Sequence, residues 1–139
     1  MSGKKLLIVI PCYNEEEALP STLKRMETLM NKMLGEKLID KNSRVMFVDD
    51  GSADNTWQIL KKGVGKTPFF EALRLSRNFG HQSAILAGMF DNEADIYVTI
   101  DADLQDDPDC IVEMLQKIKA GADIVYGVRR ERSSDTWFK

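Results

Sequence analysis

Two carboxylates stand one residue apart in Asp101-Ala102-Asp103, directly after the apolar run at residues 96–100. No Lys or Arg lies between them, so their charges repel and lose hydration unless a cation joins them. If strand geometry persists, both side chains project to one side, and Gln105 continues the alternation with a neutral oxygen. Three such oxygens leave coordination positions open for phosphate, which predicts an Mg²⁺ or Mn²⁺ site beside a substrate.

A second polar group follows the first apolar run and consists of Pro11, Tyr13, Asn14 and Glu15. Tyr13 offers a flat face for a nucleobase, and Asn14 or Glu15 can hydrogen-bond a ribose or a base edge. The same residue types also suit a turn that caps a helix, and local physics does not separate the two interpretations.

A third group, Asp49-Asp50-Gly51-Ser52, ends the second apolar run. The adjacent carboxylates are suited to hold a base, a ribose or a metal, and the alternative, a cap on the next helix, explains one Asp well and two less well. After the third run, Arg77 is suited to pair with a diphosphate, and Gly80 would let backbone N–H groups approach it. The single histidine, His81, fits a cap or loop position better than a general base.

Apolar runs alternate with amphipathic stretches along the whole chain, which is typical of βα units that build a parallel sheet. We therefore expect an α/β fold with an open, mostly parallel sheet and helices on both faces, forming one domain over residues 1–139. Ligands bind such sheets at the carboxyl ends of the strands, where the polar groups lie. The expected strands are 6–11, 45–49, 69–75, 96–101 and 123–126, and the expected helices are 15–33, 54–62, 82–90 and 109–119.

Composition sets limits on function. The chain has 139 residues, 43% of them hydrophobic, and its net charge of −3 gives no electrostatic reason to expect nucleic-acid binding. Cys12 and Cys110 lack paired metal spacing and are expected to be reduced and buried. No apolar run is long enough to span a bilayer. A P-loop and a G-x-G-x-x-G fingerprint are both missing, which disfavours P-loop ATPase and nicotinamide chemistry.

Taken together, these motifs resemble family 2 glycosyltransferases of the GT-A fold, a Rossmann-like nucleotide-sugar-binding domain. Within that family the chain is most similar to polyprenyl-phosphate sugar transferases, the dolichyl-phosphate mannose synthase and bactoprenol glucosyltransferase group. The likeness runs in order over nearly the whole chain. It rests on residues 8–15, 48–52 with Asp54 and Thr56, 76–80, 101–108 and 127–129.

The resemblance implies a role for each matching residue. Asp101, Asp103 and Gln105 would hold the metal on the donor diphosphate, as in the DXD motif of such enzymes, and Arg129 would assist phosphate binding and catalysis. The remaining donor contacts implied are Pro11, Tyr13, Asn14, Glu15, Asp49, Asp50, Arg77, Asp101 and Ala102.

The resemblance further implies transfer of a hexose, with inversion, from a UDP- or GDP-sugar to a polyprenyl phosphate in a membrane. We expect interfacial or membrane helices to follow Lys139 and to complete the acceptor site. The whole protein would then lie at the cytoplasmic face of a membrane, with the present segment soluble, and an oligomer is compatible with the sequence. Alternatives are a family 2 enzyme with a saccharide or protein acceptor, nucleotide binding without turnover, or a phosphorylation-responsive signalling module.

Overall fold

The structure of the chain is a computed structural model that describes residues 3–104 and 107–121. The chain divides into two compact units, residues 1–105 and 106–139. The larger unit contains the sheet and three helices, whereas the described part of the smaller unit contains one helix, α4 (Cys110–Lys119). The expected strand at 123–126 lies outside the described residues. A single domain over 1–139 stays a prediction.

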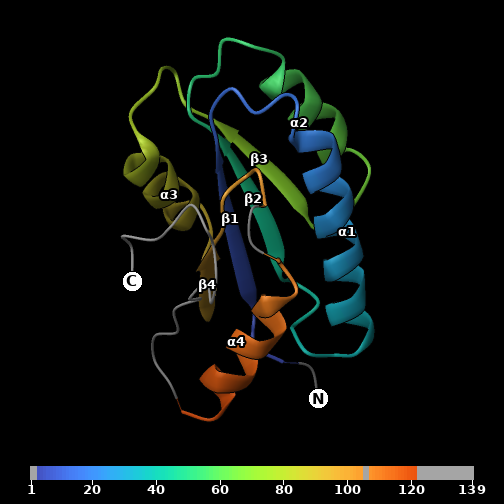
Figure 1. The fold of residues 1–139 in the computed structure, drawn as a ribbon. Helices are drawn as coiled ribbons and strands as arrows, with labels where there is room; N and C mark the ends of the chain where they lie inside the picture. Colours follow the sequence, from blue (N-terminus) through green and yellow to red (C-terminus); the bar gives the residue numbers. More distant parts are fainter. Residues whose placement is uncertain (1–2, 105–106, 122–139) are drawn as a thin grey trace, which may run out of the picture. The chain divides into compact units, whose positions relative to one another are not determined.

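Four parallel strands form the sheet of the larger unit in the order β3-β2-β1-β4 (Figure 1). Ile8 of the central strand is paired with Val45 on one side and with Val98 on the other. The strands are β1 (Leu6–Cys12), β2 (Arg44–Asp49), β3 (Phe70–Arg74) and β4 (Ile96–Thr99). All seven residues of β1 are buried, as expected for a central strand that is covered on both faces.

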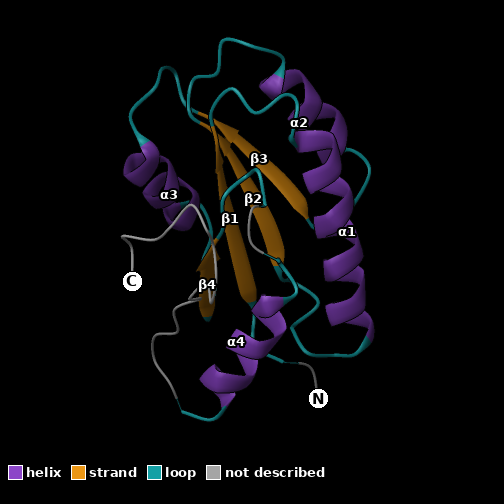
Figure 2. Cartoon of the chain, in the orientation of Figure 1, coloured by secondary structure: helices purple, strands orange, loops and turns teal. Residues whose placement is uncertain are grey.

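Helices cover both faces of this sheet, which confirms the predicted fold class. Figure 2 shows α1 (Leu19–Gly35) and α2 (Thr56–Val64) on one side and α3 (His81–Phe90) on the other. The apolar stripe of α1 repeats at helical spacing, and Met26, Met30 and Met33 are fully buried in it. These methionines therefore serve core packing, as their spacing predicts.

On the opposite face, α3 lies close to the sheet because its inner surface carries small residues. Ala84 packs with Leu7, Val9, Met46 and Val48 in one buried cluster. A Cβ at Gly88 would lie 2.7 Å from Val9 Cγ1 and 2.9 Å from Val48 Cγ2. Glycine at this position is what lets the helix backbone approach the strands.

The strand boundaries differ from the sequence prediction in all four strands, by one residue at the start of β2 and at each end of β3, and at the carboxyl ends of β1 and β4. β1 continues past Pro11 to Cys12, whose carbonyl accepts a hydrogen bond from Asp50 N (2.8 Å). Along β1 the backbone groups of successive residues point alternately toward β2 and toward β4, and those of Cys12 point toward β2. Pro11 therefore lacks an N–H on the β4 side, where strand pairing has ended by Thr99, so no ladder hydrogen bond is lost. β4 also stops at Thr99, two residues before the predicted end, because the chain turns at Asp101.

Among the helices that the structure describes, none combines the length and the apolar character needed to cross a bilayer.

Replacement of Gly88 by Ala should destabilise the fold. Overpacking of a core costs about 1–3 kcal/mol, and the gain in helix propensity offsets about 1 kcal/mol of it. We expect Gly88→Ala to lower the free energy of unfolding by about 1 kcal/mol in urea titrations with an unchanged m-value. Gly35→Ala is the matched control, since a Cβ there meets nothing within 4 Å. Equal unfolding midpoints for the two variants would contradict the close approach of α3.

Candidate active site

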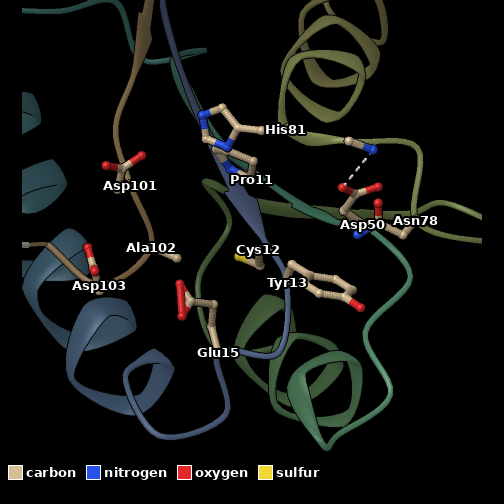
Figure 3. Close-up of a pocket in the computed structure, with 11 residues that line it drawn as sticks. Pro11, Cys12, Tyr13, Glu15, Asp50, Asn78, His81, Asp101, Ala102 and Asp103 are labelled. Atoms are coloured by element: carbon tan, nitrogen blue, oxygen red, sulfur yellow. Dashed lines mark hydrogen bonds between the residues drawn. The ribbon is translucent and has the colours of Figure 1, made fainter.

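A cavity of about 310 Å³ opens at the carboxyl ends of the strands, and we call it the edge cavity. It lies at the switch point of the sheet, where the chain leaves β1 toward β2 and later returns to β4 on the other side of β1. Its lining consists of Pro11, Cys12, Tyr13, Glu15, Asp50, Asn78, Gly80, His81, Asp101, Ala102 and Asp103 (Figure 3). Seven of these lining residues are ones that the sequence assigned to donor or metal binding: Pro11, Tyr13, Glu15, Asp50, Asp101, Ala102 and Asp103.

Asp101 and Asp103 lie on a turn and not on an extended strand. Leu104 N donates to the Asp101 carbonyl (3.2 Å), which closes the turn directly after β4. The predicted reason for their proximity, strand alternation, is therefore wrong, although both exposed carboxylates line the cavity. The turn is held by α1, because the buried Thr22 hydroxyl donates to the Ala102 carbonyl (2.5 Å).

A third carboxylate, Glu15, faces this turn from the β1–α1 loop (Figure 3). Burial raises the pKa of Glu15, and the negative charges of Asp103, Asp101 and Asp54 raise it further. This side of the cavity therefore has a negative potential that a bound cation would relieve. Within residues 3–104 and 107–121, however, no group of three or more His, Cys, Asp or Glu side chains is arranged to hold a metal ion.

The β1–α1 loop is fastened to the β2–α2 loop by hydrogen bonds in both directions. Asn14 N donates to Ser52 Oγ and Glu15 N donates to Thr56 Oγ1, each at 2.8 Å. In return, Ala53 N donates to Asn14 Oδ1 at 2.8 Å. Tyr13 and Glu15 thus reach the cavity from a loop whose backbone is fixed on both sides.

Asp54 connects the same two loops. Its carboxylate accepts hydrogen bonds from the Thr56 hydroxyl (2.5 Å) and from Glu16 N (3.2 Å). Desolvation opposes ionisation of Asp54, but the hydrogen bonds from Thr56 and Glu16 outweigh it and hold its pKa below the ordinary value.

Asp50 fixes the other wall of the cavity. Its carboxylate is buried and accepts Phe79 N at 2.8 Å and Gly80 N at 3.1 Å. The turn at Gly51 has φ of +75°, and a Cβ there would lie 2.5 Å from both Arg77 C and Asn78 N. Only glycine tolerates both the conformation and this approach, so the β2–α2 loop lies directly against the β3–α3 loop.

Three predicted donor contacts do not line the edge cavity. The amide oxygen of Asn14 accepts a hydrogen bond from Ala53 N. The fully buried Asp49 accepts a hydrogen bond from Ser52 N (3.0 Å), and its Oδ2 lies 3.6 Å from Arg74 Nε. Arg77 lies over the ring of Phe79, with 4.0 Å between the guanidinium carbon and the ring centroid. These three residues contact backbone N–H groups, the Arg74 side chain and a neighbouring ring. Sequence spacing does not reveal such contacts.

The other two predicted site residues, Gln105 and Arg129, lie outside the described residues. Their assignments to metal and phosphate binding stay predictions.

Gly80, which the sequence placed near a diphosphate, lines the cavity, and three further lining residues were not assigned to the site by sequence: Cys12, Asn78 and His81. Cys12 is buried as expected, and burial raises the pKa of its thiol, with the charges of Glu15 and Asp49 adding to the effect. Asn78 and His81 flank the loop end that Asp50 holds, and His81 is the first residue of α3. The available signal was that Asn78 lies within the motif at 76–80 and His81 directly after it, but the residue chosen from that motif was Arg77.

Comparison with known proteins identifies the family. Residues 7–139 match the model of glycosyl transferase family 2, so the chain belongs to this family. It is 43% identical over 136 residues to the glycosyltransferase YkoT of Bacillus subtilis (strain 168), covering 96% of this chain and 40% of YkoT. The glycosyltransferase YkcC of the same organism is 42% identical, with 95% and 39% covered. The chain thus spans about two fifths of the length of these relatives.

Solved structures share the fold of GT-A glycosyltransferases with this chain. Mannosyltransferase PcManGT from Pyrobaculum calidifontis, in complex with GDP-Man and Mn²⁺, superimposes with a TM-score of 0.61 at 19% identity, covering 74% of this chain and 28% of that enzyme. S. aureus TarS 1–349 in complex with UDP-GlcNAc gives a TM-score of 0.54 at 22% identity, with 71% and 26% covered. At these identities the likeness establishes the fold alone.

Removal of the Thr56 hydroxyl should loosen the two loops. Thr56→Val leaves Glu15 N without its acceptor and Asp54 without one donor, in a fully buried position. An unsatisfied buried group costs about 1–3 kcal/mol, so the free energy of unfolding in urea should fall by that amount. Thr56→Ser keeps the hydroxyl and should retain most of the stability. If Thr56→Ser loses as much as Thr56→Val, the hydroxyl is not the cause.

The raised pKa of Glu15 should appear in the pH dependence of stability. A carboxyl with a higher pKa in the folded chain contributes stability that is present below its unfolded-state pKa, about 4.3, and is lost as pH rises through the folded-state pKa. Glu15→Gln stays neutral, so its free energy of unfolding should increase relative to the parent chain as pH rises through that window.

Urea unfolding at a series of pH values checks this expectation. In an Asp103→Asn background the gain from Glu15→Gln should shrink, because one of the charges that raise the Glu15 pKa has been removed. A gain that does not vary with pH would refute the raised pKa of Glu15, and an undiminished gain in the Asp103→Asn background would refute the coupling to Asp103.

Proposed function

We propose that the protein is a metal-dependent inverting glycosyltransferase that moves a hexose from a UDP- or GDP-sugar to a polyprenyl phosphate. The observation that carries the proposal is the edge cavity, where a stacking ring and buried acceptor (Tyr13, Asp50) share one space with two exposed carboxylates (Asp101, Asp103). A nucleoside diphosphate needs both kinds of contact, one for its base and one for its phosphates. Family membership supports the transferase class.

The metal in this proposal is Mg²⁺ or Mn²⁺, and the residues present suit it. Asp101 and Asp103 offer the hard oxygen donors that these cations prefer, and their charges already raise the pKa of Glu15. Gln105 is proposed as the third ligand. When bound, the metal would act as a Lewis acid on the departing diphosphate. Relatives of the same fold contain Mn²⁺, among them PcManGT with GDP-Man.

The donor's nucleoside would occupy the opposite side of the cavity. Tyr13 is half exposed and has a free face for base stacking, and its loop is fastened through Asn14 and Glu15. Pro11 and Ala102 would bound the space between base and diphosphate. Arg129 is proposed to assist at the phosphates. Asn14, Asp49 and Arg77 would act through the loops that they stabilise.

The acceptor makes few chemical demands on these residues. A phosphate monoester is already anionic at neutral pH, so its oxygen needs little help from a general base. A saccharide or protein hydroxyl acceptor would need such a base. The resemblance to polyprenyl-phosphate sugar transferases is what favours the lipid phosphate, with interfacial or membrane segments of the whole protein at a cytoplasmic membrane face. Hydroxyl acceptors and donor binding without turnover are the alternatives.

Substitution of Asp103 provides the test. Asp103→Ala in the whole protein should lower Mn²⁺-dependent turnover by at least about 10²-fold, since an electrostatic contact made in the transition state is lost. The assay follows radiolabelled sugar from UDP- and GDP-donors into an organic-solvent extract of membranes. Asp91→Asn, an exposed carboxylate outside the cavity, is the control and should keep full turnover.

Label that stays in the aqueous phase on saccharide or protein would redirect the proposal to those acceptors. Full turnover by Asp103→Ala would refute the metal assignment.

A further inference from the structure

We propose that the outer face of α3 is the docking surface for the part of the whole protein that follows Lys139. The surface is formed by Leu86 and Phe90, which we call the outer stripe. The relatives YkoT and YkcC are matched over 40% and 39% of their length, so most of each relative lies outside the match and supplies the candidate occupant. The inference goes beyond the proposed function and does not depend on its donor or acceptor.

The outer stripe reverses the usual arrangement of a surface helix. Ala84 and Gly88, the small residues of α3, are buried on its inner face, where Gly88 lies against side chains of the strands. Leu86 and Phe90 each follow two residues later, which places them on the opposite side of the helix, and they are 50% and 85% exposed. A surface helix normally carries polar residues on that side, whereas a helix that is apolar all round is typically buried. The outer face of α3 therefore has the character of a covered surface.

The other two helices of the larger unit do not share this character. Lys24 and Arg25 of α1 and Lys61 and Lys62 of α2 are exposed. In contrast, α3 contains no Lys, Arg, Asp or Glu. Figure 2 shows that α3 lies on the opposite side of the sheet from α1 and α2. The exposed apolar surface is therefore specific to one helix and one side of this unit.

A further apolar group lies on the same side of the sheet, on β4. Tyr97 is paired with Leu7, and paired residues of neighbouring strands point to the same face. Leu7 belongs to the buried cluster beneath α3, so Tyr97 also lies on the α3 side. Its hydroxyl donates to the Asn92 carbonyl (3.3 Å), and its side chain is 39% exposed. A segment docked on this side of the sheet would find apolar contacts on both α3 and β4.

The size of the outer stripe favours a tethered occupant over a second copy of the chain. A stable interface between separate chains buries about 800 Å² on each partner. The ten residues of α3 extend over about 15 Å, and Leu86 and Phe90 are its exposed apolar side chains. Two side chains do not provide the area that such a dimer needs. A segment of the same polypeptide needs less, because the linkage makes its docking intramolecular.

The charge beside the outer stripe favours protein over a lipid surface. Asp91 and Glu93 follow Phe90 closely, and both are exposed. The cytoplasmic face of a membrane is negatively charged and would repel these carboxylates. A protein segment can instead present complementary charges. We therefore expect the docked segment to be apolar, with a Lys or Arg where it meets Asp91.

Docking at the outer stripe would link the downstream part of the protein to the edge cavity. His81 is the first residue of α3 and lines the cavity, and Phe90 is the last residue of the same helix. A segment that packs on Leu86 and Phe90 would thus rest on the element that carries part of the cavity wall.

Photo-cross-linking in the whole protein tests the identity of the occupant. A benzophenone derivative of phenylalanine replaces Phe90, and mass spectrometry identifies the cross-linked peptides. We expect a peptide from beyond Lys139, in a product that keeps the monomer mass on a denaturing gel. The same derivative in place of Gln58, an exposed residue of α2, is the control and should not give this product. A cross-link to a second copy, to another protein or to lipid, or no cross-link beyond Lys139, would overturn the inference.

Thermal unfolding provides a second test. The double variant Leu86→Gln/Phe90→Gln should leave the midpoint of the 139-residue chain unchanged, because both side chains are exposed there. In the whole protein the midpoint should fall by at least about 2 °C, since two covered apolar side chains are lost. Lys61→Gln, at an exposed position of α2, is the control and should change neither midpoint. An equal shift in both chains, or in neither, would contradict the proposed docking and would leave the proposed function standing.

Discussion

The β2–α2 loop is the part of this molecule on which the site depends. Its side chains, together with that of Thr56 at the start of α2, accept hydrogen bonds from Asn14 N and Glu15 N on one side and from Phe79 N and Gly80 N on the other. Backbone N–H groups beyond the ends of strands have no ladder partner, and near a buried edge they must find another acceptor. Because one loop supplies acceptors to both of its neighbours, it fixes the positions of the β1–α1 loop and the β3–α3 loop relative to one another.

This arrangement changes how the acidic residues of the chain are understood. The buried ones, Asp49 and Asp50, and the partly buried Asp54 serve mainly as acceptors for backbone groups. Asp101 and Asp103 remain exposed in the cavity. Asp49 and Asp54 thus build the site, Asp101 and Asp103 face its cavity, and the buried Asp50 does both.

Much of the fold could be predicted from sequence because its signals are local or periodic. The buried run of β1 and the methionine stripe of α1 each identify their elements, and the carboxyl ends of parallel strands place the site. The turn at Asp101 could not be predicted, since the contact that holds it, from the Thr22 hydroxyl to the Ala102 carbonyl, joins distant segments of the chain. Asn78 was missed for a similar reason: a stacking contact turns its neighbour Arg77 aside, and no spacing rule contains that contact.

The strand order also has a consequence for how the chain acquires its structure. β1 pairs with β2 through a short crossover, but its other neighbour, β4, pairs Val98 with Ile8 across 98 − 8 = 90 positions. Contacts of such long sequence separation form late, because closing a long loop costs entropy before any pairing rewards it. On the ribosome, β1 to β3 can assemble while residue 98 has still to be synthesised. The turn that carries Asp101 would then be the last part of the cavity to arrive.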